Sequence, residues 1–164
     1  MFLAASIPLG SCDAGLAEPV AELADAPQLE LTGRVVDAAD IFPDEVEARL
    51  VKLSEELEAA TKVQLVIAST PNLNGEEIEK YARDLGNLWG LGDAERDDGL
   101  LLLVAPNERK VRIAVGLGLE ETLPDEDCML VIDEMLPLFK QGNIPEGTEL
   151  GARRLNRMTR ERMM

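Results

Sequence analysis

Six consecutive apolar residues at positions 100–105, Leu-Leu-Leu-Leu-Val-Ala, constrain the fold of this chain most strongly. A strand with one face in water alternates apolar and polar residues, so an unbroken apolar run is typical of a strand buried on both faces. Residues 110–115 do alternate, and the segment Pro-Asn-Glu-Arg at 106–109 forms a turn between the two runs. We therefore predict an antiparallel hairpin whose first strand is central in a sheet.

The segments around this hairpin have the apolar spacing of helices. Residues 43–60 open with Pro43 followed by acidic residues, which favours a helix N-terminus, and carry apolar residues three and four positions apart. The same reasoning predicts helices at 76–89, 124–139 and 148–162, a strand at 63–69, and loops at 71–75 and 142–147. This order of elements predicts an α/β domain with helices on a small mixed sheet.

The charge balance and the missing histidine exclude several function classes. The chain has 164 residues with 32 acidic and 16 basic side chains, a net charge of −16 that repels nucleic-acid backbones and attracts cations. Without histidine there is no Ser-His-Asp or Cys-His nucleophile and no histidine-ligated metal. The two cysteines cannot form a disulfide framework, and Cys128, between apolar neighbours in a predicted helix, is expected to be a buried thiol.

The first 33 residues differ in character from the rest. Residues 1–12 are mostly apolar and end in Leu-Gly-Ser-Cys, which resembles a bacterial lipoprotein processing box with Cys12 as the lipidated residue. The positive n-region is missing, so an incidental cysteine in a disordered terminus is the alternative. Residues 13–33 are expected to form a flexible acidic linker to a domain over 34–162. No apolar run is long enough to cross a membrane.

Several short blocks in the predicted domain resemble the TPM domain family, which includes the thylakoid acid phosphatase, photosystem-repair proteins and their bacterial envelope relatives. The resemblance covers residues 35 to 162 and rests on these blocks: Val-Val-Asp-Ala-Ala-Asp-Ile at 35–41, Gln-Leu-Val-Ile at 64–67, Leu-Trp-Gly-Leu-Gly at 88–92, Asp-Asp-Gly at 97–99, and Val-Arg-Ile-Ala-Val-Gly-Leu-Gly-Leu-Glu at 111–120.

This resemblance implies a three-layer α/β/α sandwich on the periplasmic or thylakoid-lumen side of a membrane. Relatives are reported to bind calcium, and plant relatives to be acid phosphatases. For this chain we expect a location on the periplasmic side of the cell envelope, attached to the membrane only through a lipid on the N-terminus. The expected partner is a membrane-protein complex or another envelope protein, and no nucleic acid.

A set of carboxylates is the candidate metal site. Because the strands at 100–105 and 110–115 should pair, the acidic residues before the first strand should lie near the glycine-rich turn after the second. Clustered carboxylates are stable when a cation neutralises them, and calcium, with magnesium or manganese as alternatives, prefers such oxygen ligands. The predicted metal ligands are Asp37, Asp97, Asp98, Glu120 and Asp127, and the predicted structural turn glycines are Gly99, Gly116 and Gly118.

Three functions remain open from the sequence. The first is a calcium-binding envelope module that acts in assembly or quality control of membrane proteins. The second is a metal-dependent acid phosphatase that uses the carboxylate cluster, although the sequence shows no organised basic pocket for phosphate. The third is a structural interaction domain without an ion site, in which the acidic residues only cap helices and turns. The arginine-rich last helix has three possible roles, which are docking on the acidic body, contact with anionic lipid and binding of a partner, and we expect the first.

Overall fold

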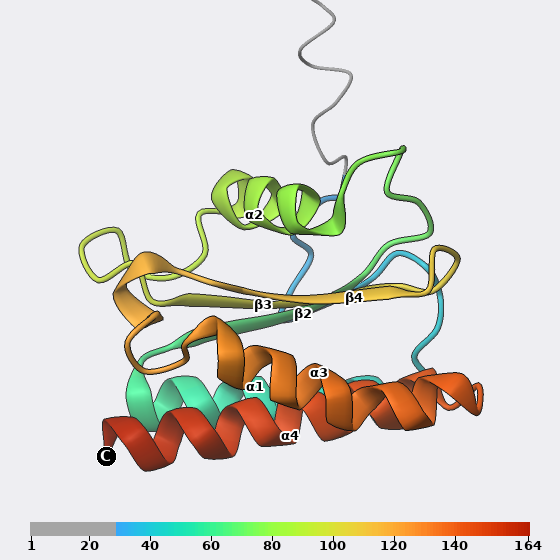
Figure 1. The fold of residues 1–164 in the computed structure, drawn as a ribbon. Coiled ribbons are helices and arrows are strands. Elements are labelled where there is room, and N and C mark those ends of the chain that lie inside the picture. The colour runs from blue at the N-terminus through green and yellow to red at the C-terminus, as the bar shows by residue number, and fades with distance from the viewer. Residues whose placement is uncertain (1–28) are drawn as a thin grey trace, which may run out of the picture.

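A computed structural model describes residues 29–164, which form a four-stranded sheet with helices on both faces (Figure 1). The strands are β1 (Val35–Asp37), β2 (Gln64–Ser69), β3 (Gly99–Ala105) and β4 (Lys110–Val115), in the order β1-β2-β3-β4. β1, β2 and β3 are parallel, and β4 is antiparallel to β3 with Leu102 opposite Ile113. The predicted hairpin and the mixed sheet are confirmed, and β3 is buried at every residue.

The helices form layers above and below this sheet. Helix α2 (Ile78–Trp89) covers β3 and β4 on one face, while α1 (Asp44–Thr61) and α3 (Asp125–Lys140) cover the other. Helix α4 (Ile144–Met163) packs against α1 and α3 on their outer side, so the helical layer below the sheet is doubled (Figure 1). A short 3-10 helix, η1 (Leu117–Leu119), connects β4 to α3. The predicted α/β sandwich is therefore correct.

The two faces of the sheet carry separate cores. Alternate residues of the strands, among them Leu65, Leu100 and Ile113, pack with α1, α3 and α4. The residues between them, such as Val66 and Leu101, pack with α2. This division follows from the period-two geometry of strands, and it explains why β3 reads as an unbroken apolar run.

Two elements differ most from the sequence prediction. Helix α4 begins at Ile144, so residues 144–147 are helical and not part of a loop; Pro145 in the first turn has the backbone geometry that starts a helix. β1 was not predicted as a strand, because three residues are too few to show an alternating pattern. Among residues 29–164, no helix is both long and apolar enough to span a bilayer.

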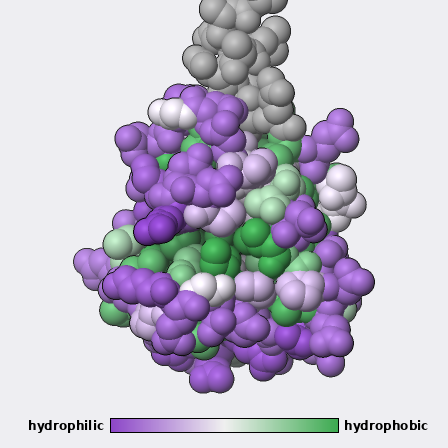
Figure 2. Space-filling view, turned by 90° about the vertical axis from the view of Figure 1, so that its right-hand side faces the viewer, coloured by the Kyte–Doolittle hydropathy of each residue, from purple (hydrophilic) through white to green (hydrophobic). Residues whose placement is uncertain are grey.

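The direction of the strands decides which loops meet. The carboxyl ends of β1, β2 and β3 lie at one end of the sheet, together with the turn between β3 and β4. Figure 2 looks onto this end, where a band of hydrophobic residues lies between hydrophilic ones above and below. The amino end of β3 and the carboxyl end of β4 lie at the opposite end. Loop residues 91–98 and η1 therefore meet there.

Candidate functional site

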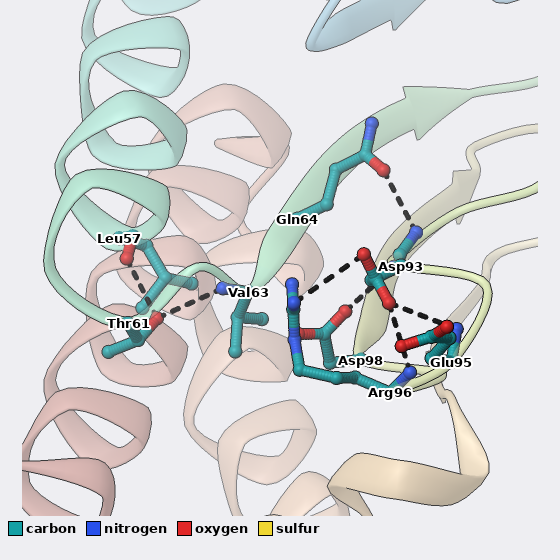
Figure 3. A network of polar contacts seen from close by, with 9 residues as sticks. Leu57, Thr61, Val63, Gln64, Asp93, Glu95, Arg96 and Asp98 are labelled. Atoms are coloured by element: carbon teal, nitrogen blue, oxygen red, sulfur yellow. Dashed lines mark hydrogen bonds and ion pairs between the residues drawn. The ribbon is translucent and has the colours of Figure 1, made fainter.

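The loop before β3 is built around a buried carboxylate. Asp98 is only 4% exposed, and its oxygens accept hydrogen bonds from the Asp93 N–H at 2.8 Å and the Arg96 Nε at 2.7 Å (Figure 3). The Asp98 carboxylate raises the pKa of Arg96. Both oxygens of Asp98 are thus used inside the loop, so this residue is a structural one in the folded chain.

Further bonds fix the same loop to itself and to β2. The Glu95 and Arg96 backbone N–H groups donate to the Asp93 carboxylate and hold its pKa below the ordinary value. The Gln64 side chain on β2 accepts a hydrogen bond from the Gly92 N–H at 2.8 Å (Figure 3). Such a loop presents its outer residues in a fixed geometry.

The predicted turn glycines let this loop lie directly on the chain that leaves β4. A Cβ on Gly118 would be 1.6 Å from the Arg96 carbonyl oxygen, and one on Gly116 would be 2.2 Å from that of Asp97. A Cβ on Gly99 would be 2.5 Å from the Leu91 carbonyl oxygen. These glycines are therefore required by close backbone approach, and none of the three has a positive φ.

Next to these glycines, a cavity of about 250 Å³ opens between α2 and the β3–β4 hairpin. Small residues of both elements line it: Ala82 and Gly86 of α2 and Ala114 of β4. Charged residues from four parts of the chain line it: Glu79, Arg83, Asp97, Arg112 and Glu120. The cavity is therefore lined by three acidic and two basic residues.

Two of the predicted metal ligands share this cavity. Asp97 is exposed and has a φ of 49°, and its Oδ2 accepts a weak hydrogen bond from the Leu117 N–H at 3.3 Å. Glu120, also exposed, follows η1. Both side chains line the same cavity while Asp98, one residue away, points into the loop. The expectation that these segments meet at one sheet end is met for Asp97 and Glu120.

The structure does not bring Asp37 and Asp127 to this cavity. Asp37 ends β1 at the opposite end of the sheet, where its carboxylate accepts hydrogen bonds from the Ile41 and Phe42 N–H groups. Asp127 lies in the first turn of α3 and pairs with Arg162 of α4. The sequence reasoning placed Asp37 by its nearness to the first helix, whereas the parallel strand β1 carries it to the far end. No group of three or more acidic or cysteine side chains arranged to hold a metal ion is found in residues 29–164.

Sequence reasoning missed three charged residues of the cavity: Glu79, Arg83 and Arg112. Glu79 and Arg83 are four residues apart on α2, a spacing that puts them on one face of the helix. Arg112 is a polar position in the alternating strand β4. These signals were present in the sequence, but only the packing of α2 on β4 shows that they meet.

The molecule is therefore an α/β sandwich with a charged cavity beside the amino end of β3 and the carboxyl end of β4. The family model for the TPM domain matches residues 35–158, so the chain belongs to the TPM domain family. No curated protein sequence matches it.

Solved structures share the fold over most of their length. The N-terminal domain of a P. gingivalis protein is 27% identical with a TM-score of 0.73, covering 80% of this chain and 86% of that one. The BA42 protein of Bizionia argentinensis is 17% identical with a TM-score of 0.66, covering 76% and 85%. The N-terminal domain of cg2496 from Corynebacterium glutamicum is 12% identical with a TM-score of 0.64, covering 82% and 84%.

Proposed function

We propose that this TPM domain is a calcium-binding module, with Asp97 and Glu120 as its side-chain ligands. The observation that carries the proposal is that these two exposed carboxylates line one cavity beside a loop whose backbone is fixed. Calcium accepts carboxylate and backbone carbonyl oxygens together, and the Arg96 and Asp97 carbonyls lie against Gly118 nearby. Magnesium and manganese are the alternative ions, and they demand stricter geometry.

Repulsion between the carboxylates favours a bound cation. Glu79, Asp97 and Glu120 surround the cavity in a chain with a net charge of −16, so a divalent ion there relieves like-charge repulsion. Arg83 and Arg112 oppose this effect from the same cavity. We therefore expect binding that is stronger at low ionic strength.

Calorimetric titration of calcium into wild type and four variants tests the proposal. Asp97→Asn and Glu120→Gln are each expected to weaken calcium binding at least about tenfold, a loss of about 1.4 kcal/mol. Asp40→Asn is the control for Asp97, because Asp40 is exposed at a φ of 53° and lies at the other end of the sheet. Glu121→Gln is the control for Glu120, since Glu121 is its exposed neighbour. Equal effects of a variant and its control would rule out this site.

A second candidate function is a metal-dependent acid phosphatase. Arg83 and Arg112 favour it, because they line the same cavity as Asp97 and Glu120 and could bind a phosphate group that a metal ion also contacts. Hydrolysis of p-nitrophenyl phosphate at acidic pH, lost in both Asp97→Asn and Arg112→Ala, would support it. If the domain binds calcium but does not hydrolyse the substrate, the non-catalytic calcium-binding module is favoured. If it binds no divalent ion, the structural interaction domain is favoured.

For the location, we propose the periplasmic side of the cell envelope, with a lipid anchor on Cys12 and a membrane-protein complex or another envelope protein as partner. Membership of the TPM family and the Leu-Gly-Ser-Cys sequence at 9–12 support this proposal. Cys12 itself lies outside the described residues. Mass spectrometry of the membrane fraction should find a diacylated peptide that begins at Cys12; an unmodified Met1 would contradict lipidation.

A further inference from the structure

One edge of β4 carries backbone groups that have no partner in the described part of the chain. Among residues 29–164, β4 ends the sheet and pairs with β3 alone. The Gly116 N–H donates to the Gly99 carbonyl at 2.8 Å, which means that Gly116 and every second residue before it turn their backbone groups toward β3. The N–H and C=O groups of Val111, Ile113 and Val115 therefore point outward. Within residues 29–164 these outward groups form no hydrogen bond.

Cavities lie on both sides of this edge. The charged cavity described above is on the α2 side of β4. A second one, of about 350 Å³, is on the α3 side, and its lining combines four apolar residues with three charged ones: Ile113, Val115, Leu123 and Pro124 with Arg112, Glu120 and Asp125. Arg112, Val115 and Glu120 line both, so the two cavities flank the same stretch of the strand. An added strand would direct alternate side chains into them.

We propose that β4 binds an extended segment of a partner protein as a fifth strand, and that this segment alternates basic and apolar residues. Its basic side chains enter the α2-side cavity, which three acidic residues line, while the guanidinium of one of its two arginines, Arg112, pairs with Asp125 on the other face. Its apolar side chains enter the α3-side cavity against the partly exposed Val115 and the exposed Pro124. This surface goes beyond the proposed calcium site, because it uses the backbone of β4.

Charge argues against a second copy of this chain as the occupant. Pairing β4 with β4 would join two molecules that each carry a net charge of −16, and like charges that face one another disfavour association. A basic segment is attracted by the same field. The occupant is therefore a cationic strand from another protein.

The side chain of Arg112 covers the free edge of β4 when no partner is bound. Arg112 belongs to the α2 face by alternation with Ile113, yet its guanidinium donates to Asp125 Oδ1 at 2.9 Å at the start of α3, on the other face. The side chain thus crosses the free edge. Charged residues in this position protect edge strands from unspecific pairing, and the ion pair must open before a partner strand adds.

Two-dimensional NMR of the full chain with a short valine–lysine repeat peptide tests this proposal. The experiment is done in chelator, so its outcome is independent of calcium binding. The amide signals of Val111, Ile113 and Val115 should shift and become protected from hydrogen exchange. A valine–glutamate repeat should bind at least about tenfold more weakly. Equal binding of the two peptides, or shifts confined to other elements, would overturn the proposal.

N-methylated peptides test strand pairing directly. In an extended strand, the amides of all valines face one way and those of all lysines the other. Methylation of one set should abolish binding and methylation of the other should leave it unchanged; loss with the valine set indicates antiparallel addition, and loss with the lysine set parallel addition. Equal effects of both sets would refute pairing.

Arg112→Ala should raise the affinity of the domain for the valine–lysine peptide about threefold, as expected for removal of a weak ion pair, while Arg109→Ala should not. A fall in affinity with Arg112→Ala would contradict the inference that Arg112 covers the edge and must move before a strand adds.

Discussion

At the residue scale, neighbouring carboxylates in this chain have different roles because their surroundings differ. Asp97 is exposed and lines a cavity, whereas Asp98 is buried and accepts hydrogen bonds from Arg96 and the Asp93 N–H. The sequence Asp-Asp does not distinguish the two. For Cys128, in contrast, the apolar neighbours in the sequence predict its burial correctly. Burial raises the pKa of the thiol to about 11, so the thiol remains protonated at neutral pH.

The difference between the two aspartates predicts that the same substitution changes the stability of the fold by different amounts at the two positions. Asp98→Asn should destabilise the fold by about 1–3 kcal/mol, because the buried acceptor loses the charge that strengthens its hydrogen bonds with Arg96 and the Asp93 N–H. Asp97→Asn should change stability by less than about 0.5 kcal/mol, as is usual for an exposed residue. Urea denaturation in chelator measures both. Equal stability of the two variants would contradict the structural role of Asp98.

At the scale of elements, the hairpin and the long helices could be predicted from the sequence, while the relative placement of loops could not. The run at 100–105 and the alternation at 110–115 define β3 and β4 by themselves. The short β1 has no such pattern, and its parallel pairing with β2 decides that Asp37 lies away from Asp97. Likewise, Glu79 and Arg83 join the site only because α2 packs on β4. These are long-range contacts, which no local pattern encodes.

Glycines at the crossing of two elements should be sensitive to a single methyl group. Gly118→Ala should destabilise the fold by about 1–3 kcal/mol, since its Cβ would overlap the Arg96 carbonyl oxygen. Gly86→Ala, in the middle of α2 with open space around it, should stabilise by up to about 1 kcal/mol through helix propensity. Thermal or urea denaturation distinguishes the two signs. Destabilisation by Gly86→Ala, or none by Gly118→Ala, would disagree with this packing.

The docking of α4 on α1 should depend on pH through Glu149. Burial raises the pKa of this carboxyl, but hydrogen bonds from Arg153 and Arg49 outweigh burial and hold the pKa below the ordinary 4.5. A lowered pKa in the folded state means stabilisation that is complete above pH 4.5 and is lost as the pH falls through the folded-state pKa.

Glu149→Gln therefore should destabilise the fold by about 1–3 kcal/mol at pH 7, and the difference from wild type should shrink below pH 4.5. Denaturation curves over a range of pH test this, with exposed Glu146→Gln on the same helix as the control. A difference that stays constant down to pH 3 would show that the ionised carboxylate is not its cause.

At the scale of the whole molecule, two groups of basic residues stand out in this acidic TPM domain. Two arginines of α4 pair with α3, in line with the prediction that the last helix docks on the acidic body: Arg154 with Glu134 and Arg162 with Asp127. Arg153 pairs within α4 with Glu149, which also pairs with Arg49 of α1. Arg83 and Arg112 instead surround the cavity beside Asp97 and Glu120. Acidic and basic side chains therefore gather at one end of the sheet, next to the free edge of β4.

The most direct test of calcium binding at that end is an amide NMR titration of the full chain with calcium. We predict saturable shifts at Asp97, Gly118 and Glu120, none at Asp37 and Asp40, and loss of these shifts in the double variant Asp97→Asn, Glu120→Gln. Shifts centred on Asp37 at the other end of the sheet, or no saturable shift anywhere, would contradict the proposed site.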